Sequence, residues 1–373
     1  MTAPRVEIDL TKIEENARCL VDRLGAYGIS VTGVTKGVCG HPDVAGAMVD
    51  GGVAGLADAR ITNIVRMRMA GITCPVSMLR APMASELEAV IRHCDTSYNT
   101  EMDTILKLGL AAEKRGASQD IILIVEMGDG REGILPEALN DFATLVIATP
   151  WVALKGIAAN FACMGSVAPT AADMITLSRL ADSVEGGCGP FVDLVSGGGS
   201  ANVPWALGEH TAWRVNNLRL GEAILLGLDP VTGRPIDGLH TDAFALFAEV
   251  IEARGKPGTI PHETTPPDLG PLRIVGQDNP GTRVVLAVGQ QDTDAGDLTF
   301  PSGFTFVGAT SDHTVVDTGQ SVMPVGSEMK MGMRYGALMR AMSARDVAKA
   351  VHGKRDMTTR AKDHDPPPFL TLV

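Results

Sequence analysis

The sequence predicts an α/β fold in which a (β/α)8 TIM-like barrel is followed by a second, mostly β C-terminal domain. From residue 30 to about residue 228, short apolar runs alternate with segments of helical spacing. Such strand–helix alternation indicates a parallel sheet, and eight units fit a closed barrel. After Gly227, proline and glycine become frequent, and strand-like pieces follow without long helices. A doubly wound open sheet is the alternative, although no Gly-x-Gly-x-x-Gly opens a helix after the first strand.

The individual elements follow from hydrophobic periodicity, in chain order. The predicted barrel strands are residues 30–36, 55–59, 74–79, 96–99, 121–127, 154–161, 191–198 and 218–226. Helical spacing lies between them, at 43–49, 61–69, 85–92, 102–114 and 171–184. In the second domain we expect strands at 282–289, 304–308 and 314–317, a helix near 344–351, and the early strand 5–9 as a further member. We therefore divide the chain into a barrel of residues 10–228 and a mostly β domain of residues 1–9 plus 229–373.

Composition excludes several classes of function. The 373-residue chain carries a net charge of −12, which disfavours nucleic-acid backbones and anionic membranes as partners. No charged-then-apolar leader opens it, and no apolar run reaches membrane length. The 6 cysteines lack Cys-x-x-Cys spacing, so we expect free thiols and a cytoplasmic location. The 8 histidines are dispersed without a His-x-x-x-His pair, so no metal site is predicted.

Lys36 closes the first predicted barrel strand and precedes a glycine-punctuated loop. Active sites of such barrels lie at the carboxyl ends of the strands. Partial desolvation there would lower the pKa of the amine, and a neutral amine is a nucleophile toward an aldehyde. Lys36 is therefore a candidate Schiff-base lysine, and a snorkelling or salt-bridged lysine is the alternative.

Other strand ends supply polar groups that suit an anionic cofactor. Residues 196–202 (Ser-Gly-Gly-Gly-Ser-Ala-Asn) follow the seventh strand and would present backbone N–H groups to a phosphate, unless they form an ordinary flexible turn. Arg131 follows the fifth strand, and Asn160, a further cofactor-binding candidate, ends the sixth. Arg219 lies within the apolar eighth strand and needs a partner, either Glu222 or a cofactor nitrogen. A lysine, a phosphate loop and two inward arginines favour pyridoxal 5'-phosphate over a metal.

Several motifs carry a family resemblance. They are Val6-Glu-Ile-Asp-Leu10, Thr35-Lys36-x-x-Cys39-Gly40, Leu56-Ala-Asp-Ala-Arg60, Gly130-Arg131-Glu-Gly133, Arg219-Leu-Gly-Glu-Ala-Ile-Leu-Leu-Gly227, Gly289-Gln-Gln-Asp292, Gly308-Ala-Thr-Ser-Asp-His313 and Met333-Arg-Tyr-Gly336. Over nearly its full length the chain resembles the fold-type III pyridoxal-phosphate enzymes of the alanine racemase superfamily, and it is most similar to the ornithine racemase branch. The resemblance implies that Lys36 holds the cofactor, that Ser200 and Tyr335 bind its phosphate, that Arg131 lies near its phenolic oxygen, and that Arg219 faces its pyridine nitrogen.

One position departs from the family pattern. Alanine racemases carry a catalytic tyrosine in an Ile-Gly-Tyr-Ala-Asp segment of the second domain, and here Gln290 occupies that place. Glutamine cannot act as a general base. His313 and Asp312 are our candidates for the missing base, since they follow a strand of the second domain and histidine titrates near neutrality. His41 is a weaker candidate.

The resemblance implies amino-acid racemisation by two-base proton transfer on a small-molecule amino acid. Lys36 would serve one face of the substrate and a second-domain residue the other, and in this family the second domain of a partner completes the site, so a homodimer is expected. A decarboxylase of the same superfamily and a non-catalytic pyridoxal-phosphate protein are the alternatives. The acidic residues Asp129, Glu222, Asp292 and Asp312 favour a substrate with a second ammonium group, such as ornithine or lysine.

Overall fold

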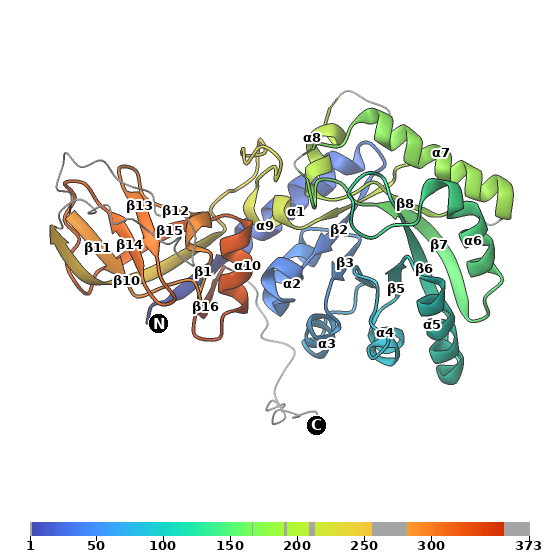
Figure 1. Cartoon of the computed structure of the whole chain (residues 1–373), viewed down its shortest axis with the longest axis horizontal. Helices are drawn as coiled ribbons and strands as arrows, with labels where there is room; N and C mark the ends of the chain where they lie inside the picture. Colours follow the sequence, from blue (N-terminus) through green and yellow to red (C-terminus); the bar gives the residue numbers. More distant parts are fainter. Residues whose placement is uncertain (1, 166, 190–191, 209–212, 256–281, 354–373) are drawn as a thin grey trace, which may run out of the picture.

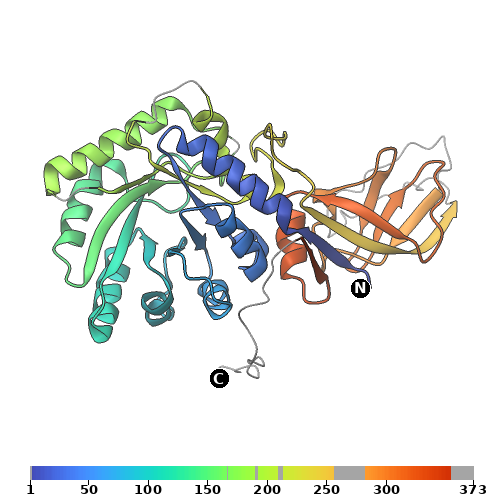
Figure 2. The same cartoon turned by 180° about the vertical axis from the view of Figure 1, so that it is seen from behind.

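Two domains of unlike architecture lie side by side in the computed structural model (Figures 1 and 2). The structure describes residues 2–165, 167–189, 192–208, 213–255 and 282–353. One domain is a closed barrel with helices around its outside, and the other is a mostly antiparallel β-sheet domain with one helix on the side of the barrel.

The barrel is built from parallel strands that pair in chain order. These strands are β2 (Ser30–Val34), β3 (Gly55–Asp58), β4 (Val76–Met78), β5 (Thr96–Asn99), β6 (Gln119–Val125), β7 (Val152–Ala159), β8 (Leu194–Ser196) and β9 (Asn217–Leu220). The ring closes because β2 pairs with both β3 and β9. The predicted eight-stranded barrel is therefore confirmed, with strand bounds shifted by a few residues.

Helices cover the outside of this barrel (Figure 1). They are α1 (Leu10–Gly25), α2 (Pro42–Asp50), α3 (Ile61–Met69), α4 (Leu87–His93), α5 (Met102–Arg115), α6 (Leu139–Ile147), α7 (Ala171–Cys188), α8 (Val203–Ala206) and α9 (Glu222–Leu226). Two of them begin at a side-chain cap: the Asp9 carboxylate accepts the N–H groups of Thr11 and Lys12 at α1, and Thr170 forms a capping box with Asp173 at α7. Short 3-10 turns follow two of the strands, η1 (Lys36–Val38) after β2 and η3 (Ser200–Asn202) after β8.

Side chains of the barrel strands alternate between the helix layer and the barrel interior, as the two-residue period of a strand requires. In β9, Leu218 and Leu220 join the large apolar cluster beneath the helices. Arg219 faces the other way, and its guanidinium lies 5.3 Å from the centre of the Tyr98 ring, which belongs to a small separate cluster. The barrel interior is therefore partly polar at β9, where Arg219 can contact a ligand.

The second domain gathers strands from both ends of the chain. Its strands are β1 (Arg5–Asp9), β10 (Phe244–Gly255), β11 (Thr282–Leu286), β12 (Leu298–Thr299), β13 (Thr305–Ala309), β14 (Thr314–Asp317), β15 (Glu328–Met333) and β16 (Ala348–His352). The early strand β1 pairs with β10 and β16, as expected for residues 5–9. Its helix is α10 (Tyr335–Ser343), and a 3-10 turn, η4 (Ala295–Asp297), precedes β12. The residue limits of the two domains stay a prediction.

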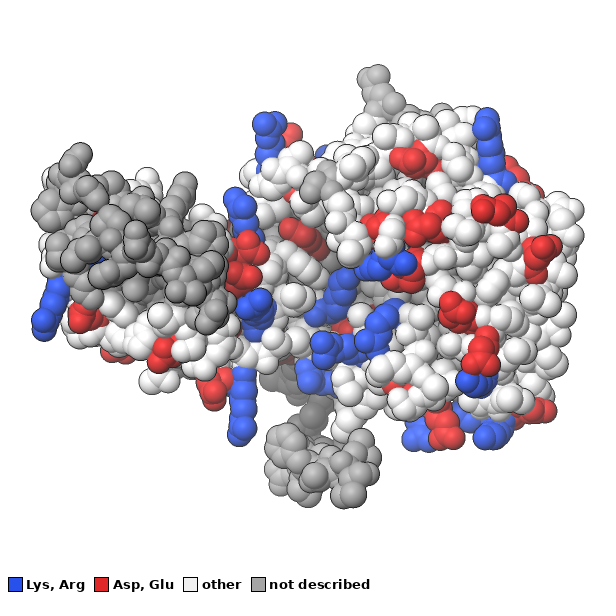
Figure 3. Space-filling view, viewed as in Figure 1, with Lys and Arg blue, Asp and Glu red and all other residues white. Residues whose placement is uncertain are grey.

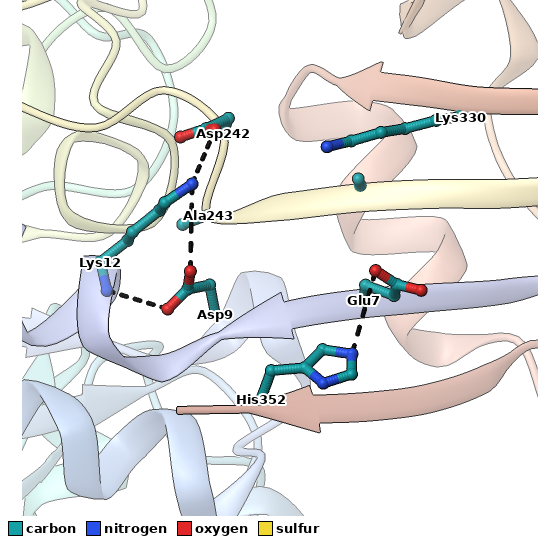
Figure 4. A pocket seen from close by; sticks show the side chains of 8 residues that line it. Glu7, Asp9, Lys12, Asp242, Ala243, Lys330 and His352 are labelled. Carbon is teal, nitrogen blue, oxygen red and sulfur yellow. Dashed lines mark hydrogen bonds and ion pairs between the residues drawn. The ribbon is translucent and has the colours of Figure 1, made fainter. Parts of the chain in front are cut away.

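Charged side chains line a small pocket of about 280 Å³ at the junction of the two domains (Figure 4). Lys12 Nζ lies 2.6 Å from Asp242 Oδ2 and 3.9 Å from Asp9 Oδ2. His352 Nε2 lies 3.9 Å from Glu7 Oε2. Exposed pairs of this kind stabilise a fold by no more than about 1 kcal/mol each, so they orient the junction rather than hold it together.

Two predicted elements are wrong. The predicted strand 218–226 ends at Leu220, and Glu222 begins the helix α9, because a short apolar run does not distinguish a strand from a fully buried helix. The helix predicted near 344–351 lies earlier, at α10, and residues 348–352 form β16. That segment pairs in parallel with β1 from the opposite end of the chain, and this pairing overrides its local preference. Strand β10 lies in the proline- and glycine-rich stretch where no strand was predicted.

Candidate active site

A cavity of about 550 Å³ opens at the carboxyl ends of the barrel strands. Its walls come from the segments that follow most of the strands, and from Tyr335 of the second domain. The cofactor residues predicted from the sequence all line it: Lys36, Arg131, Asn160, Ser200, Arg219 and Tyr335. Side chains that are far apart in the sequence thus meet in one place, as the barrel architecture predicts.

Lys36 stands at the start of η1, directly after a buried threonine. The Thr35 hydroxyl donates to Asp58 Oδ2 at 2.7 Å, which anchors the end of β2 to the end of β3. Within the described residues, the Lys36 amine has neither a hydrogen bond nor an ion pair. Its side chain is open to the cavity yet surrounded by protein, so burial lowers the pKa of the amine; the nearby Cys163 thiol opposes this shift, and the charges of Arg131 and Arg219 add to it. A lowered pKa favours the neutral, nucleophilic amine.

Arg219 is almost fully buried and is held by neutral acceptors. Its Nη1 donates to Ser196 Oγ at 2.6 Å, and its Nη2 donates to the Ala159 carbonyl oxygen at 2.6 Å and to Asn160 Oδ1 at 3.0 Å. No carboxylate of the described chain pairs with it, so the suggestion that Glu222 neutralises Arg219 is wrong. Burial lowers the pKa of its guanidinium.

One donor of Arg219 is left over. The hydrogen bonds from both Nη atoms go to protein oxygens, and the Tyr98 hydroxyl is a further neighbour of the guanidinium, whereas Nε–H makes no such bond to a backbone or amide oxygen of the residues that the structure describes. Because Arg219 lines the cavity, this donor is available to a ligand bound there. An aromatic ring nitrogen with a lone pair would satisfy it, which fits the pyridine nitrogen of pyridoxal 5'-phosphate.

The opposite part of the cavity fits a phosphate. In the described structure, the backbone N–H groups of Ser200, Ala201 and Glu222 have no acceptor. The Ser200 hydroxyl oxygen accepts the N–H of Ala223 at 3.0 Å, so its own hydrogen remains available to an anion. Free backbone donors at the starts of helical turns are a recurrent way to bind phosphate.

Tyr335 reaches this region because a glycine makes room for it. A Cβ at Gly37 would lie 2.9 Å from Cε2 and 3.0 Å from the hydroxyl of Tyr335, closer than real side chains approach. Burial, and then the negative charge of Glu222, raises the pKa of the Tyr335 phenol, so the group stays a neutral hydrogen-bond donor. The position of Tyr335 agrees with the phosphate-binding role that the resemblance implies.

Arg131 is positioned by two acidic neighbours in its own loop. Its Nε lies 2.8 Å from Glu132 Oε2 and 3.5 Å from Asp129 Oδ2. Asp129 also accepts the N–H of Cys163 at 2.8 Å, which ties the loop after β6 to the loop after β7. Asp129 is therefore committed to holding Arg131 and these loops in place.

Some predicted catalytic residues lie outside the cavity of their own chain. His313 and Asp312 occupy the connection between β13 and β14, exposed to solvent, with His313 Nδ1 2.9 Å from Asp312 Oδ1. His41 is the residue that precedes α2, makes no side-chain capping hydrogen bond there, and does not line the cavity either. Asp292 is used within the second domain, where Oδ2 accepts the N–H of Gly289 at 2.9 Å.

Arg80 and Cys163 are among the side chains that line the cavity and that sequence reasoning did not select. Arg80 follows β4 and lies 3.3 Å from Glu86 Oε2. A signal for it was present, since an arginine directly follows the predicted strand 74–79. Cys163 lies further from its strand end, and nothing in its spacing distinguishes it.

The charge distribution supports an anionic ligand. Figure 3 shows lysine and arginine side chains gathered on the barrel, on the side nearer the second domain, with acidic side chains dispersed over the rest of this face. The cavity itself is lined by Lys36, Arg80, Arg131 and Arg219, against only Glu132 and Glu222 among the described residues. A chain with a net charge of −12 thus presents local positive charge at its site.

Comparison with known proteins identifies the family. A model of the alanine racemase N-terminal domain matches residues 8–230. The lysine racemase of Thermotoga maritima is 33% identical over 353 residues, which cover 94% of this chain and 98% of that protein. The chain belongs to the alanine racemase family. The ornithine racemase of Acetoanaerobium sticklandii is another member similar to it, 30% identical over 350 residues that cover 93% of this chain and 99% of that protein.

Solved structures of low sequence identity share the fold. The alanine racemase of a D-cycloserine-producing Streptomyces lavendulae has a TM-score of 0.73 at 18% identity, covering 96% of this chain and 100% of that one. The D-threonine aldolase of Filomicrobium marinum has a TM-score of 0.72 at 16% identity, covering 94% and 92%. The (β/α)8 barrel with its second β domain is therefore the architecture of this family.

Family membership makes the chain an amino-acid racemase and implies pyridoxal 5'-phosphate as its cofactor. The free Nε–H of Arg219, the free backbone donors around Ser200 and the unpaired Lys36 amine fit the ring nitrogen, the phosphate and the aldehyde of that molecule. No group of three or more potential metal ligands occurs in the described residues. None of the helices they form combines the length and hydropathy needed to cross a bilayer.

Proposed function

We propose that this racemase interconverts the enantiomers of a basic amino acid of the lysine or ornithine class, with Lys36 as the cofactor lysine. The observation that carries the proposal is the convergence of Lys36, Ser200, Arg219 and Tyr335 on one cavity. The relatives named above, a lysine racemase and an ornithine racemase that match almost the whole chain, support the substrate class.

Each of the cavity residues has a separate role in the proposed reaction. The cofactor, when bound, stabilises the negative charge that remains when the α-proton departs. Lys36 Nζ would hold the cofactor and would accept and return the α-proton on one face of the substrate. Ser200 and Tyr335 would donate hydrogen bonds to the cofactor's phosphate. Arg219 Nε–H would donate to the ring nitrogen and, as a guanidinium, would not protonate it at neutral pH, which would disfavour transamination as a side reaction.

The second base is proposed to be His313, with Asp312 as its orienting group. Asp312 Oδ1 lies 2.9 Å from His313 Nδ1, which fixes the ring and leaves Nε2 for proton transfer. Because these residues lie outside the cavity of their own chain, a partner subunit would have to supply them, and we propose a homodimer on this ground. All of the cysteines are free thiols, which supports the proposed cytoplasmic location.

The test is incubation with single L-amino acids in deuterium oxide, followed by measurement of α-deuterium and of chirality. The proposal expects inversion with solvent deuterium at the α-carbon and fastest turnover of lysine or ornithine. Release of carbon dioxide would instead identify a decarboxylase, and no turnover of any amino acid would contradict the assignment.

The dimer and its base are tested by His313→Asn. This variant should lose racemisation while Lys36 still exchanges the α-proton of one enantiomer. Mixing it with Lys36→Ala should restore part of the activity, because a hybrid dimer contains one intact site. Normal racemisation by His313→Asn would move the role to Asp312 or His41, and an active monomer would refute the shared site.

A further inference from the structure

We propose that Glu222 is the specificity-determining residue of this racemase, and that its carboxylate binds the distal ammonium group of the basic substrate. The inference rests on the proposed function and identifies the residue responsible for its substrate class. Glu222 is selected from the acidic residues of the chain because it lines the cavity and has no partner there among the described residues.

Most of the charged side chains that line the cavity already have a partner. Arg131 and Glu132 pair with each other, Arg80 pairs with Glu86, and the Nη atoms of Arg219 are hydrogen-bonded. Among the charged side chains that line the cavity in the described structure, this leaves Lys36 and Glu222 without a hydrogen bond or an ion pair. The family assigns Lys36 to the cofactor. Glu222 is then the charged group that is left for the substrate.

The second observation is the surroundings of Glu222, which strengthen its attraction for a cation. It is half-buried as the first residue of α9, and the negative charges of Asp297 and Asp229 lie near it. Asp229 is occupied by its own turn, where it accepts the Val231 N–H at 3.0 Å and the Thr232 hydroxyl at 2.6 Å. The Tyr335 phenol, another titratable neighbour of Glu222, is neutral. Nothing cationic in the described chain compensates these carboxylates, and an ammonium group would.

Burial, together with Asp297 and Asp229, raises the pKa of the Glu222 carboxyl to about 7. A bound ammonium would stabilise the ionised form, and a cofactor phosphate at Ser200 would oppose it. The direction of the pH dependence follows: below neutral pH Glu222 is protonated and loses its attraction for an ammonium, whereas above neutral pH the attraction is complete. The distal ammonium itself stays charged over this range, since amines of this kind titrate near 10.

The other acidic residues suggested by the sequence do not fill this role. Asp129 is held by Arg131 and by backbone donors, Asp292 is bonded within the second domain, and Asp312 pairs with His313 at the surface. None of the three lines the cavity of its own chain. Of the four acidic residues that the sequence suggested for binding a second ammonium group, Glu222 is thus the one that lies in this cavity.

A role for Glu222 as the second base is less compatible with the barrel. Strands β2 and β9 are neighbours, so Lys36 and Glu222 project from adjacent parts of the wall. Inversion needs proton transfer on opposite faces of the substrate. A group beside Lys36 is better placed to contact the end of a side chain than to face Lys36 across the α-carbon.

The experiment compares basic substrates with neutral ones of equal length, in the cofactor-loaded enzyme. Ornithine is paired with norvaline and lysine with norleucine, and the ratio of their kcat/KM values isolates the distal ammonium. Glu222→Gln should lower this ratio by about ten- to a hundredfold, since losing one partner of a partly buried charge pair removes binding of that order. Glu222→Asp should recover part of the preference.

Glu88→Gln is the matched control, because Glu88 also lies in the first turn of a barrel helix but is exposed and outside the cavity. It should leave the ratio unchanged. A second readout is equilibrium binding of ornithine and norvaline, followed by the cofactor absorbance between pH 6 and 8.5. The preference for ornithine should rise with pH in the wild type and become flat in Glu222→Gln.

The outcomes separate the inference from the proposed function. Unchanged preference in Glu222→Gln, or equal loss of all substrates, would overturn the role of Glu222 and leave the racemase assignment standing. A wild-type enzyme that does not prefer ornithine to norvaline would overturn it as well. If the wild type racemises no amino acid at all, the proposed function itself fails.

Discussion

Replacing Arg219 by methionine should leave the cofactor-free protein almost as stable as the wild type, although this arginine is buried and makes several hydrogen bonds. A buried ion that serves the fold is normally neutralised by a carboxylate, and its removal destabilises by about 3–5 kcal/mol. Arg219 has no carboxylate partner in the described structure. Its charge is therefore an unfavourable contribution to folding, which the substitution removes.

The magnitude follows from the acceptors that Arg219 leaves behind. Ser196 Oγ keeps a partner in Asn217 Oδ1 at 2.7 Å, and Asn160 opens to the water of the cavity. With the Ala159 carbonyl, we expect a loss of about 1 kcal/mol per acceptor, about 3 kcal/mol in all. Removing a buried guanidinium that has no counter-charge raises the free energy of unfolding by several kcal/mol, because its desolvation cost disappears. A methionine also packs favourably on the Tyr98 ring. The two contributions nearly cancel.

Urea unfolding of the cofactor-free variant, with the slope m compared to that of the wild type, measures this difference. We expect a change in the free energy of unfolding within about 2 kcal/mol. Arg92→Met is the control for loss of an exposed guanidinium, with an expected change below about 0.5 kcal/mol. A loss above about 4 kcal/mol for Arg219→Met would show that Arg219 is mainly a structural residue.

In the loaded enzyme, Arg219→Glu should lower racemisation and raise transamination. Full retention of rate and specificity would refute the electronic role of Arg219.

The remaining predictions concern cofactor binding. Lys36→Ala should abolish both the absorbance of covalently bound cofactor and the adduct trapped by borohydride; a trapped adduct on another lysine would contradict the assignment. Gly37→Ala should weaken cofactor binding at least severalfold in a titration, because its Cβ would lie 2.9 Å from the ring of Tyr335. Gly186→Ala in α7 is its control, since a Cβ there meets nothing within 4 Å, and it should leave cofactor affinity unchanged. Equal affinity in Gly37→Ala and the wild type would refute the close packing of Tyr335.

Much of the barrel could be predicted from local sequence because its strands and helices differ in period and alternate regularly. Prediction failed where a segment depends on a distant partner. Residues 348–352 become a strand because β1 lies beside them, and the run that begins at Glu222 becomes a helix because it is enclosed on all sides. Local preference is weak compared with such packing.

In the candidate site, too, local features could be predicted from the sequence and long-range contacts could not. Placement at strand ends was enough to select Lys36, Arg131 and Ser200, since parallel strands bring their carboxyl ends to one edge. Arg80 was overlooked although it follows a predicted strand. The four acidic residues could not be ranked from the sequence, because a carboxylate's role depends on which donors surround it in space.

By itself the sequence determined the chemistry of this protein: a lysine, a phosphate loop and inward arginines at the ends of barrel strands, with Gln290 in place of the family tyrosine. Only the tertiary structure decided which charges are paired. It joined Arg131 to Glu132, surrounded Arg219 with neutral acceptors and left Lys36 and Glu222 without a partner among the described residues that line the cavity. The physical reason is that residue type and spacing fix periodicity along one chain segment, whereas ion pairing and burial depend on distances between segments that only folding brings together.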